Sequence, residues 1–234
     1  MASTKIIAKS IEQIPKNQMI FASQFYFNYL YDQVSESSYY KTLERMCKSG
    51  ELSKIAKGTY YRPKTGKYGI VPPSQREIVN AFIENKCGTV IGYSLFNSLR
   101  LTTQVSKTIE VLSSQIEGQT KTIQNVFVSF CNLDYTEEVE QTVHMMEVLQ
   151  NFYEIQDINH QEFLAYSKKF AEMFSDSTFD YVIKYKHYPK RTISFLQEVL
   201  NYHQIPNRLN KYLSSLSEYK HPKMEEIYET AFVS

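Results

Sequence analysis

The chain has 234 residues, of which 42% are hydrophobic, and its 26 Lys and Arg nearly balance its 25 Asp and Glu, giving a net charge of +1. This length suits one or two domains with a sizeable core. The sequence contains no apolar run that could span a bilayer and begins without a long apolar segment and cleavage site, so we expect a cytoplasmic protein that does not associate with membranes.

Three helices are predicted at the start of the chain. Apolar residues recur at helical spacing over residues 5–14, and a shorter helix follows from 24 to about 31. The third helix begins at Ser35 or Ser37, because serine side chains accept hydrogen bonds from the first N–H groups of a helix, and it ends at Gly50. Its predicted inward stripe is Tyr39, Thr42, Leu43 and Met46.

A short basic hairpin is predicted directly after the third helix. Two extended runs, over residues 52–55 and 59–62, flank Ala56-Lys57-Gly58, where Gly58 can adopt a positive φ at little cost. Three helices followed by a hairpin form the plan of a winged helix-turn-helix, whose third helix enters the major groove of DNA. A solvated helix face and a surface turn are the simpler alternative, but the order of helix, stop and basic hairpin favours DNA binding.

The residues expected to face DNA share an outward position on the third helix or the hairpin: Ser37, Ser38, Tyr40, Lys41, Arg45, Lys54, Lys57 and Arg62. Hydroxyl and cationic side chains are typical donors to base edges and phosphates. The charge distribution agrees, because residues 1–72 hold 11 Lys and Arg against 5 Asp and Glu (net +6), whereas residues 73–234 hold 15 against 20 (net −5). The N-terminal region should therefore attract phosphate and the remainder repel it.

The rest of the chain is predicted to be mixed and then helical. Residues 64–73, with two glycines and two prolines, indicate a linker, and residues 107–113 and 120–130 indicate strands joined by a turn at Glu117-Gly118-Gln119. The other predicted elements are a helix opened by the capping-box pair Ser74 and Glu77, a turn or strand over 88–92, and helices over 93–101, 137–152, 161–174, 179–185, 189–203 and 206–216.

These elements predict an α+β protein that is mostly α. We expect a winged helix-turn-helix DNA-binding domain over residues 1–66. A second domain over residues 67–234 is expected to combine a small β-hairpin or sheet with a helical C-terminal half.

Two blocks of the sequence carry a family resemblance. In the first, Ile14-Pro15-Lys16 precedes Ile20-Phe21, and the hairpin ends in the segment Gly58–Pro63. The second runs from Ile91 to Val105 and is similar to a Gly–Tyr–…–Asn–x–Leu–x–Leu–Thr–x–Gln–Val pattern, with an apolar strand after it. Together they resemble the AbiEi-type antitoxins of the abortive-infection, type IV toxin–antitoxin group, and a related bacterial family of unknown function. The resemblance covers about residues 8–130.

The resemblance implies two activities. The N-terminal domain would bind the operator of its own operon, as double-stranded DNA, and repress it. The second domain would counteract a nucleotidyltransferase-like toxin encoded next door, without requiring a stable complex. The chain departs from the common family pattern at Tyr39 and Thr42, so the operator sequence does not carry over.

The family-like positions of the second domain are Gly92, Tyr93, Asn97, Thr103 and Gln104. We interpret them as structural: Gly92 for a turn, Tyr93 for packing, and Asn97 and Gln104 as buried hydrogen-bonding groups. A direct role in neutralising the toxin is the alternative interpretation.

Catalysis, metal binding and cofactor binding are not expected. The sequence has no Asp-x-Asp after Gly92-Tyr93-Ser94, no phosphate-binding glycine loop, and no His or Cys pair at metal-ligand spacing. Glu110, Glu117 and Lys121 faintly resemble a nuclease motif, but a solvated hairpin explains them better.

A ligand-responsive regulator without a toxin is the main alternative function. Its effector pocket would involve the aromatic segment 179–188, although such a stripe is more often core or interface. The sequence does not predict the oligomeric state.

Overall fold

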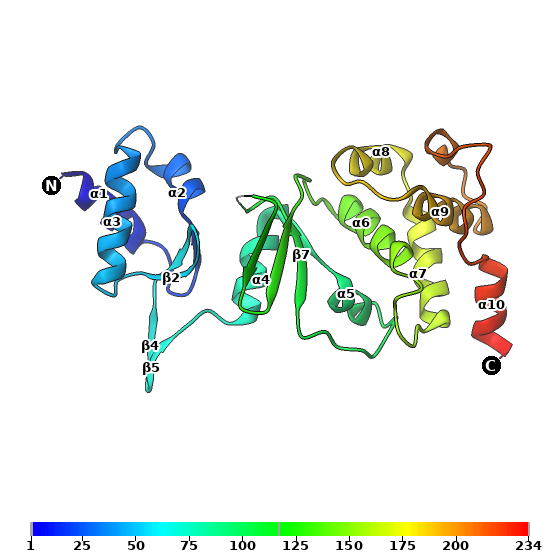
Figure 1. The fold of residues 1–234 in the computed structure, drawn as a ribbon, viewed down its shortest axis with the longest axis horizontal. Coiled ribbons are helices and arrows are strands. Elements are labelled where there is room, and N and C mark those ends of the chain that lie inside the picture. Colours follow the sequence, from blue (N-terminus) through cyan, green and yellow to red (C-terminus); the bar gives the residue numbers. More distant parts are fainter. Residues whose placement is uncertain (1, 117, 234) are drawn as a thin grey trace.

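The computed structural model describes residues 2–116 and 118–233 and is a mixed α+β structure, about half helical, with small sheets. Figure 1 shows three parts in a row: a bundle of helices with a small sheet near the N-terminus, a central sheet, and a group of helices near the C-terminus. The two ends of the chain lie at opposite ends of the molecule.

The helices are α1 (Ala2–Glu12), α2 (Ala22–Tyr29), α3 (Glu36–Lys48), α4 (Gln75–Ile83), α5 (Gly92–Ser98), α6 (Glu137–Gln150), α7 (His160–Met173), α8 (Asp176–Tyr185), α9 (Lys190–Tyr202) and α10 (Met224–Val233), with short 3₁₀ helices η1 (Glu84–Lys86) and η2 (Leu209–Tyr212). The strands are β1 (Met19–Phe21), β2 (Ser53–Ala56), β3 (Thr59–Tyr61), β4 (Lys64–Gly66), β5 (Gly69–Val71), β6 (Gly88–Ile91), β7 (Ile109–Ser113), β8 (Thr120–Ile123) and β9 (Val126–Phe130).

Helices α1, α2 and α3 pack around their own core, with a three-stranded sheet of order β1–β3–β2 beside them. The inward stripe predicted for α3 is confirmed, since its four residues are the buried ones of this helix. Gly50 and Gly58 have φ values of 80° and 68°, as a helix end and a tight hairpin require. Strand β1 is not among the predicted elements, because three residues are too few to show a period.

The segment 64–73 is not the linker that its composition suggests. It contains the hairpin β4–β5, in which Lys64 pairs with Val71 and Gly66 with Gly69. The two glycines stand on either side of a two-residue turn, and Gly69 has a φ of 115°. Glycines that mark a flexible linker by composition therefore close a turn here.

The central sheet has the order β6–β7–β9–β8, with β7 and β9 parallel. The predicted strand 120–130 is two strands, which turn at Gln124, a residue with a φ of 53°. Polar β8 takes one edge, while the apolar strands β7 and β9 pair in the middle. In the turn predicted between the strands, Glu117 lies outside the described residues.

The two faces of the central sheet belong to different cores. Val111 and Val128 share one core with residues of α4 and with Met19 of the N-terminal part. Leu112 and Ile91 belong to the other, where α5 and α6 begin the large helical core. The sheet thus joins the N-terminal helices to the C-terminal ones.

Helix α4 opens as predicted, with a capping box between Ser74 and Glu77. The predicted helix 206–216 is wrong, because only η2 forms there. Asp176 accepts hydrogen bonds from the backbone and the guanidinium of Arg208, which holds this segment against α8 instead. None of the helices in the described part of the chain is both long enough and apolar enough to cross a bilayer.

Candidate nucleic-acid interface

The outward face of α3 carries a stripe of hydroxyl and cationic side chains. Ser37, Lys41 and Arg45 are exposed and lie four residues apart, so they share one side of the helix. Tyr39 and Leu43 are 0% exposed and fix the opposite side against α1 and α2. The packing of the helix therefore leaves the stripe accessible along its length.

Arg45 is held in place by two hydroxyl groups. Its Nη2 atom donates to Oγ1 of Thr4 at 3.0 Å and to Oγ1 of Thr42 at 3.1 Å. The guanidinium stays exposed. It can thus present its remaining N–H groups outward from a defined position, which lowers the entropy cost of binding an anion.

Tyr40 and Ser38 lie closer to the core than we expect of DNA-facing residues. The Tyr40 hydroxyl is 3.1 Å from Oγ of Ser23, which ties α3 to the first turn of α2. Both Ser38 and Tyr40 are half-buried, and the Ser38 carbonyl accepts a hydrogen bond from Thr42. These two residues lie at the edge of the exposed stripe.

The tip of the β2–β3 hairpin is packed against the rest of the protein. The backbone N–H of Ala22 donates to the Gly58 carbonyl at 2.9 Å, and Nζ of Lys121 donates to the Lys57 carbonyl at 3.1 Å. The side chains of Lys54 and Lys57 remain exposed. The hairpin is consequently a fixed support rather than a free wing, although its two lysines still face solvent.

Arg62 has structural partners. Its Nη1 atom donates to the Glu12 carbonyl at 2.6 Å and to the Ile14 carbonyl at 2.5 Å, and the residue is half-buried. The Glu12 carbonyl is one that the end of α1 leaves without an intrahelical partner, and Ile14 lies two residues beyond that end. Arg62 therefore links the end of α1 to β3, and its other nitrogen atoms are the ones left for a phosphate.

The β4–β5 hairpin adds exposed basic and aromatic groups that lie outside the set predicted from the sequence. All six strand residues are exposed, and Tyr68 at the turn is 94% exposed. Lys64 and Lys67 lie on the same hairpin. Figure 1 shows it extending away from both the N-terminal helices and α4.

A protein-family model described as "Family of unknown function (DUF6088)" matches residues 6–135, more than half of the chain. The chain belongs to this family. No curated protein is significantly similar to it. The DUF6088 segment contains α3, both N-terminal hairpins and the whole central sheet, and it ends just before α6. The helical C-terminal part lies outside the match.

Within the DUF6088 segment, Gly92 has the predicted turn conformation. Its φ is 64°, and a Cβ atom there would lie 2.5 Å from Oε1 of Glu110. Tyr93 extends from the same turn, and its hydroxyl donates to the Glu154 carbonyl at 2.8 Å. Both residues thus position the start of α5 beside the end of α6.

Asn97 and Gln104 make hydrogen bonds, but the prediction that they are buried is wrong. Nδ2 of Asn97 donates to the Thr102 carbonyl at 3.1 Å, yet Asn97 is exposed. The half-buried Gln104 donates to Asp157 at 3.4 Å through Nε2, and Thr103 is exposed. The neighbouring Thr102 is the buried member, 4% exposed, and its hydroxyl donates to the Gln156 carbonyl at 2.7 Å.

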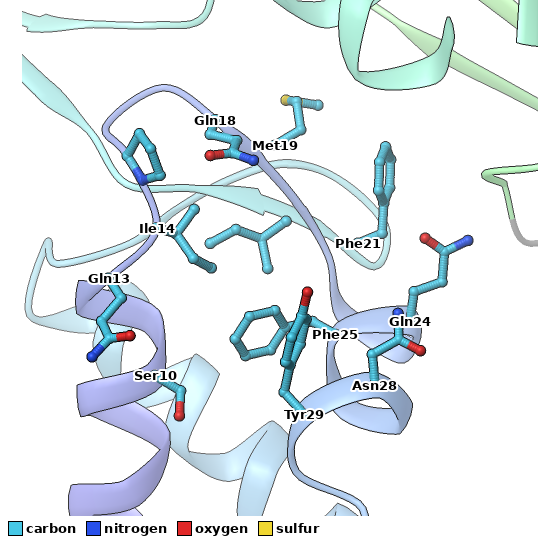
Figure 2. A pocket seen from close by; sticks show the side chains of 12 residues that line it. Ser10, Gln13, Ile14, Gln18, Met19, Phe21, Gln24, Phe25, Asn28 and Tyr29 are labelled. Carbon is cyan, nitrogen blue, oxygen red and sulfur yellow. The ribbon is translucent and has the colours of Figure 1, made fainter. Parts of the chain in front are cut away.

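A cavity of about 500 Å³ lies between α1, β1 and α2. Figure 2 shows Ile14, Phe25 and Tyr29 gathered in its middle, with the amides of Gln13 and Gln24 toward its edges. Within the described chain, no charged side chain lines it. Its volume falls within the range of small-molecule sites, and polar and apolar groups contribute about equally to its lining.

The residues of the nuclease-like pattern do not come together. Glu110 lies on β7 and Lys121 on β8, and β9 separates these strands. Glu110 pairs with Phe127 whereas Lys121 pairs with the neighbouring Val128, so the two side chains point to opposite faces of the sheet. Glu117 lies outside the described residues. Among the residues that are described, no group of three or more His, Cys, Asp or Glu is placed to hold a metal ion.

Proposed function

We propose that this protein binds a specific operator in double-stranded DNA through a winged helix-turn-helix formed by residues 1–66, and represses its own operon. The element order α1, β1, α2, α3, β2, β3 and the sheet order β1–β3–β2 are consistent with such a domain. The exposed stripe of Ser37, Lys41 and Arg45 on α3 is the observation that carries the proposal.

The distribution of charge along the chain also supports DNA binding by the N-terminal part. The N-terminal 72 residues carry 11 Lys and Arg against 5 Asp and Glu. In the first turn of α6, by contrast, Glu137, Glu138 and Glu140 follow one another closely. DNA would be attracted to the N-terminal part and repelled by the C-terminal helices.

We further propose that residues 67–234 act as the antitoxin of a type IV, AbiE-like toxin–antitoxin system in the cytoplasm. This role rests on the likeness of the 91–105 block to AbiEi-type antitoxins. The counteracted protein would be a nucleotidyltransferase-like toxin from a neighbouring gene. Since the proposed antagonism needs no stable complex, co-purification is not its test.

A gel-shift with the DNA immediately upstream of the gene tests the repressor proposal. The protein should bind this DNA more tightly than a scrambled sequence of equal length, and less tightly as salt increases. Equal binding of both sequences would contradict an operator, and the absence of binding by folded protein would overturn DNA binding altogether.

Variants of α3 make the test residue-specific. Lys41→Ala with Arg45→Ala should weaken operator binding and make its salt dependence shallower, by about one unit of slope for each phosphate no longer neutralised. Arg45 also bonds Thr4 and Thr42, so Lys41→Ala alone separates binding from stability. Lys168→Ala with Lys169→Ala removes two exposed charges from α7 and should leave binding unchanged.

The antitoxin proposal has its own experiment. Co-expression of the full chain should restore growth to cells that carry the neighbouring nucleotidyltransferase-like gene. A version with the Lys41→Ala and Arg45→Ala changes should still restore growth when both genes are under foreign promoters, because repression then plays no part. If a well-expressed protein does not restore growth, the antitoxin proposal is overturned and the repressor proposal is unaffected.

The cavity in Figure 2 favours a second candidate, a ligand-responsive regulator. Its location differs from the predicted one, because Phe179 and Val182 of the 179–188 segment are 0% exposed in the helical core. Uncharged heteroaromatic compounds match a lining of apolar and aromatic side chains with amide groups at the rim. This function would be supported by a compound of this class that raises the melting temperature of the protein and releases operator DNA. The same compound should have neither effect on the Tyr29→Ala variant.

A further inference from the structure

We propose that the β4–β5 hairpin, residues 64–71 and here called the arm, clamps the sugar–phosphate backbone of DNA beside the site occupied by α3. The proposal rests on the DNA-binding function proposed above and adds a second contact to it. The arm extends away from the body of the protein (Figure 1).

The arm is held at its base and free along its length. Pro63 precedes β4, and Pro72 follows β5, which restricts the backbone at both ends of the arm. No residue of the arm belongs to the three hydrophobic cores of the described chain. Ile70 is 59% exposed and Tyr68 94% exposed, so the hairpin presents apolar and aromatic surface that the fold does not use.

The positive charge of the arm indicates an anionic partner. From Arg62 to Arg76 the sequence has four basic residues and no acidic one. Lys64 and Lys67 are exposed, and neither makes a salt bridge within the described residues. The carboxylate of Glu77, which follows this run, accepts hydrogen bonds from the backbone N–H and the hydroxyl of Ser74, and its attraction to Lys64 is a smaller effect than these bonds. An exposed hairpin whose charged residues, Lys64 and Lys67, are both cationic suits a polyanion.

The arm also supplies what the β2–β3 hairpin does not. The tip of that hairpin is bonded to Ala22 and Lys121, so it is not free to follow a DNA backbone. Lys67 and Tyr68 form the tip of the arm, where a lysine ammonium and a tyrosine hydroxyl can both donate to phosphate oxygens. The arm thus adds, at residues 64–71, a backbone contact that the fixed tip of the β2–β3 hairpin does not make.

The length of the arm sets the size of the contact. Three residues per strand, at about 3.3 Å each, reach about 10 Å, which is the length of about three base pairs at 3.4 Å. The arm therefore covers a few base pairs next to the α3 site. Phosphate contacts carry no sequence information, so this contribution is the same on any DNA.

The test compares an arm variant with a matched control in the full-length protein. The arm variant is Lys64→Ala, Lys67→Ala and Tyr68→Ala. The control is Lys168→Ala, Lys169→Ala and Tyr153→Ala, which removes the same groups from exposed positions of the C-terminal part. The readouts are the dissociation constants for operator and scrambled DNA between about 50 and 200 mM salt, the range in which counterion release is resolved.

For the arm variant, we expect the slope of log K against log salt to become shallower by about 2, and affinity at about 150 mM salt to fall by about thirtyfold on both DNAs. Hydroxyl-radical footprinting should show about three fewer protected base pairs at one edge. The control should match the unmodified protein. An unchanged melting temperature verifies that each variant is folded.

The outcomes distinguish the arm proposal from the proposed DNA-binding function on which it rests. If the unmodified protein binds no DNA, both proposals are overturned. If it binds operator DNA and Lys41→Ala weakens that binding, but the arm variant has the same affinity, slope and footprint, the arm proposal alone is overturned. A change in oligomeric state with unchanged DNA affinity also overturns it, and assigns the arm to a protein interface.

Discussion

The ammonium group of Lys121 lies 3.1 Å from the carbonyl oxygen of Lys57 and donates a hydrogen bond to it. The same group donates to Oγ1 of Thr59 at 2.9 Å, and Thr59 is 0% exposed. Strand β8 of the central sheet therefore holds the tip of an N-terminal hairpin in place. Phe21 and Phe82, with ring centroids 5.1 Å apart, add an aromatic contact between the N-terminal part and α4.

Replacing Lys121 by Met should loosen this junction. Without the two charge-assisted hydrogen bonds to the hairpin, the free energy of unfolding should fall by about 1–2 kcal/mol. Urea denaturation measures the change, and Lys169→Met on α7 is the control for removal of an exposed lysine. Equal stability of the two variants would show that the Lys121 hydrogen bonds contribute nothing to the junction.

Arg62 offers a direct comparison between structural support and DNA contact. Arg62→Ala should cost about 1–3 kcal/mol of stability, because one carbonyl oxygen at the end of α1 and one just after it are deprived of a charged donor. Arg62→Lys keeps the charge but lacks the planar fork of a guanidinium, so it should be destabilised as well. DNA affinity corrected for folding should change little in Arg62→Lys. A stable Arg62→Lys with weakened DNA binding would make Arg62 a phosphate contact instead.

Local signals in the sequence predict local structure well. The stripe from Tyr39 to Met46 is buried as expected, and the capping box at Ser74 is present. Non-local pairing could not be predicted: β1 pairs with β3, about 40 residues away, and β7 pairs with β9 rather than with β8. Periodicity within a strand carries no information about its neighbour.

The candidate site likewise has features that the sequence predicts and features that it does not. The exposed stripe on α3 follows from helix spacing alone. The partners of Arg62 and of the hairpin tip depend on where α1, α2 and β8 come to lie, which no short pattern reports. The arm was not predicted for a different reason. Gly66 and Gly69 suggest a flexible linker by composition, although their spacing also fits a two-residue turn.

Gly92→Ala should test the turn that begins α5. A positive φ disfavours any side chain by about 1–2 kcal/mol, and the new Cβ would also displace the Glu110 carboxylate. Gly50→Ala is the matched control, since Gly50 has a φ of 80° but no described atom outside Gly50 and its two chain neighbours lies within 4 Å of the place where its Cβ would be. Urea denaturation should show a larger fall in stability for Gly92→Ala. Combining it with Glu110→Ala should remove the excess.

Glu110 should make stability depend on pH. The carboxyl is half-buried, and burial, followed by repulsion from Glu147, raises its pKa above 4.5. Glu147 is itself engaged, by the Tyr188 hydroxyl at 3.0 Å and Nζ of Lys186 at 3.2 Å, and its negative charge still disfavours ionisation of Glu110. A raised pKa means that the folded state binds the Glu110 proton more tightly than the unfolded state.

Stability from this group is therefore fully present below pH 4.5 and is lost as pH rises through the raised pKa. Glu110→Gln, which cannot ionise, should be more stable than the unmodified protein at about pH 7, and the difference should shrink as the pH approaches 4.5. Urea denaturation at several pH values gives the comparison, with the exposed Glu172→Gln as the control. A difference that stays constant with pH would mean that the substitution acts through packing rather than through charge.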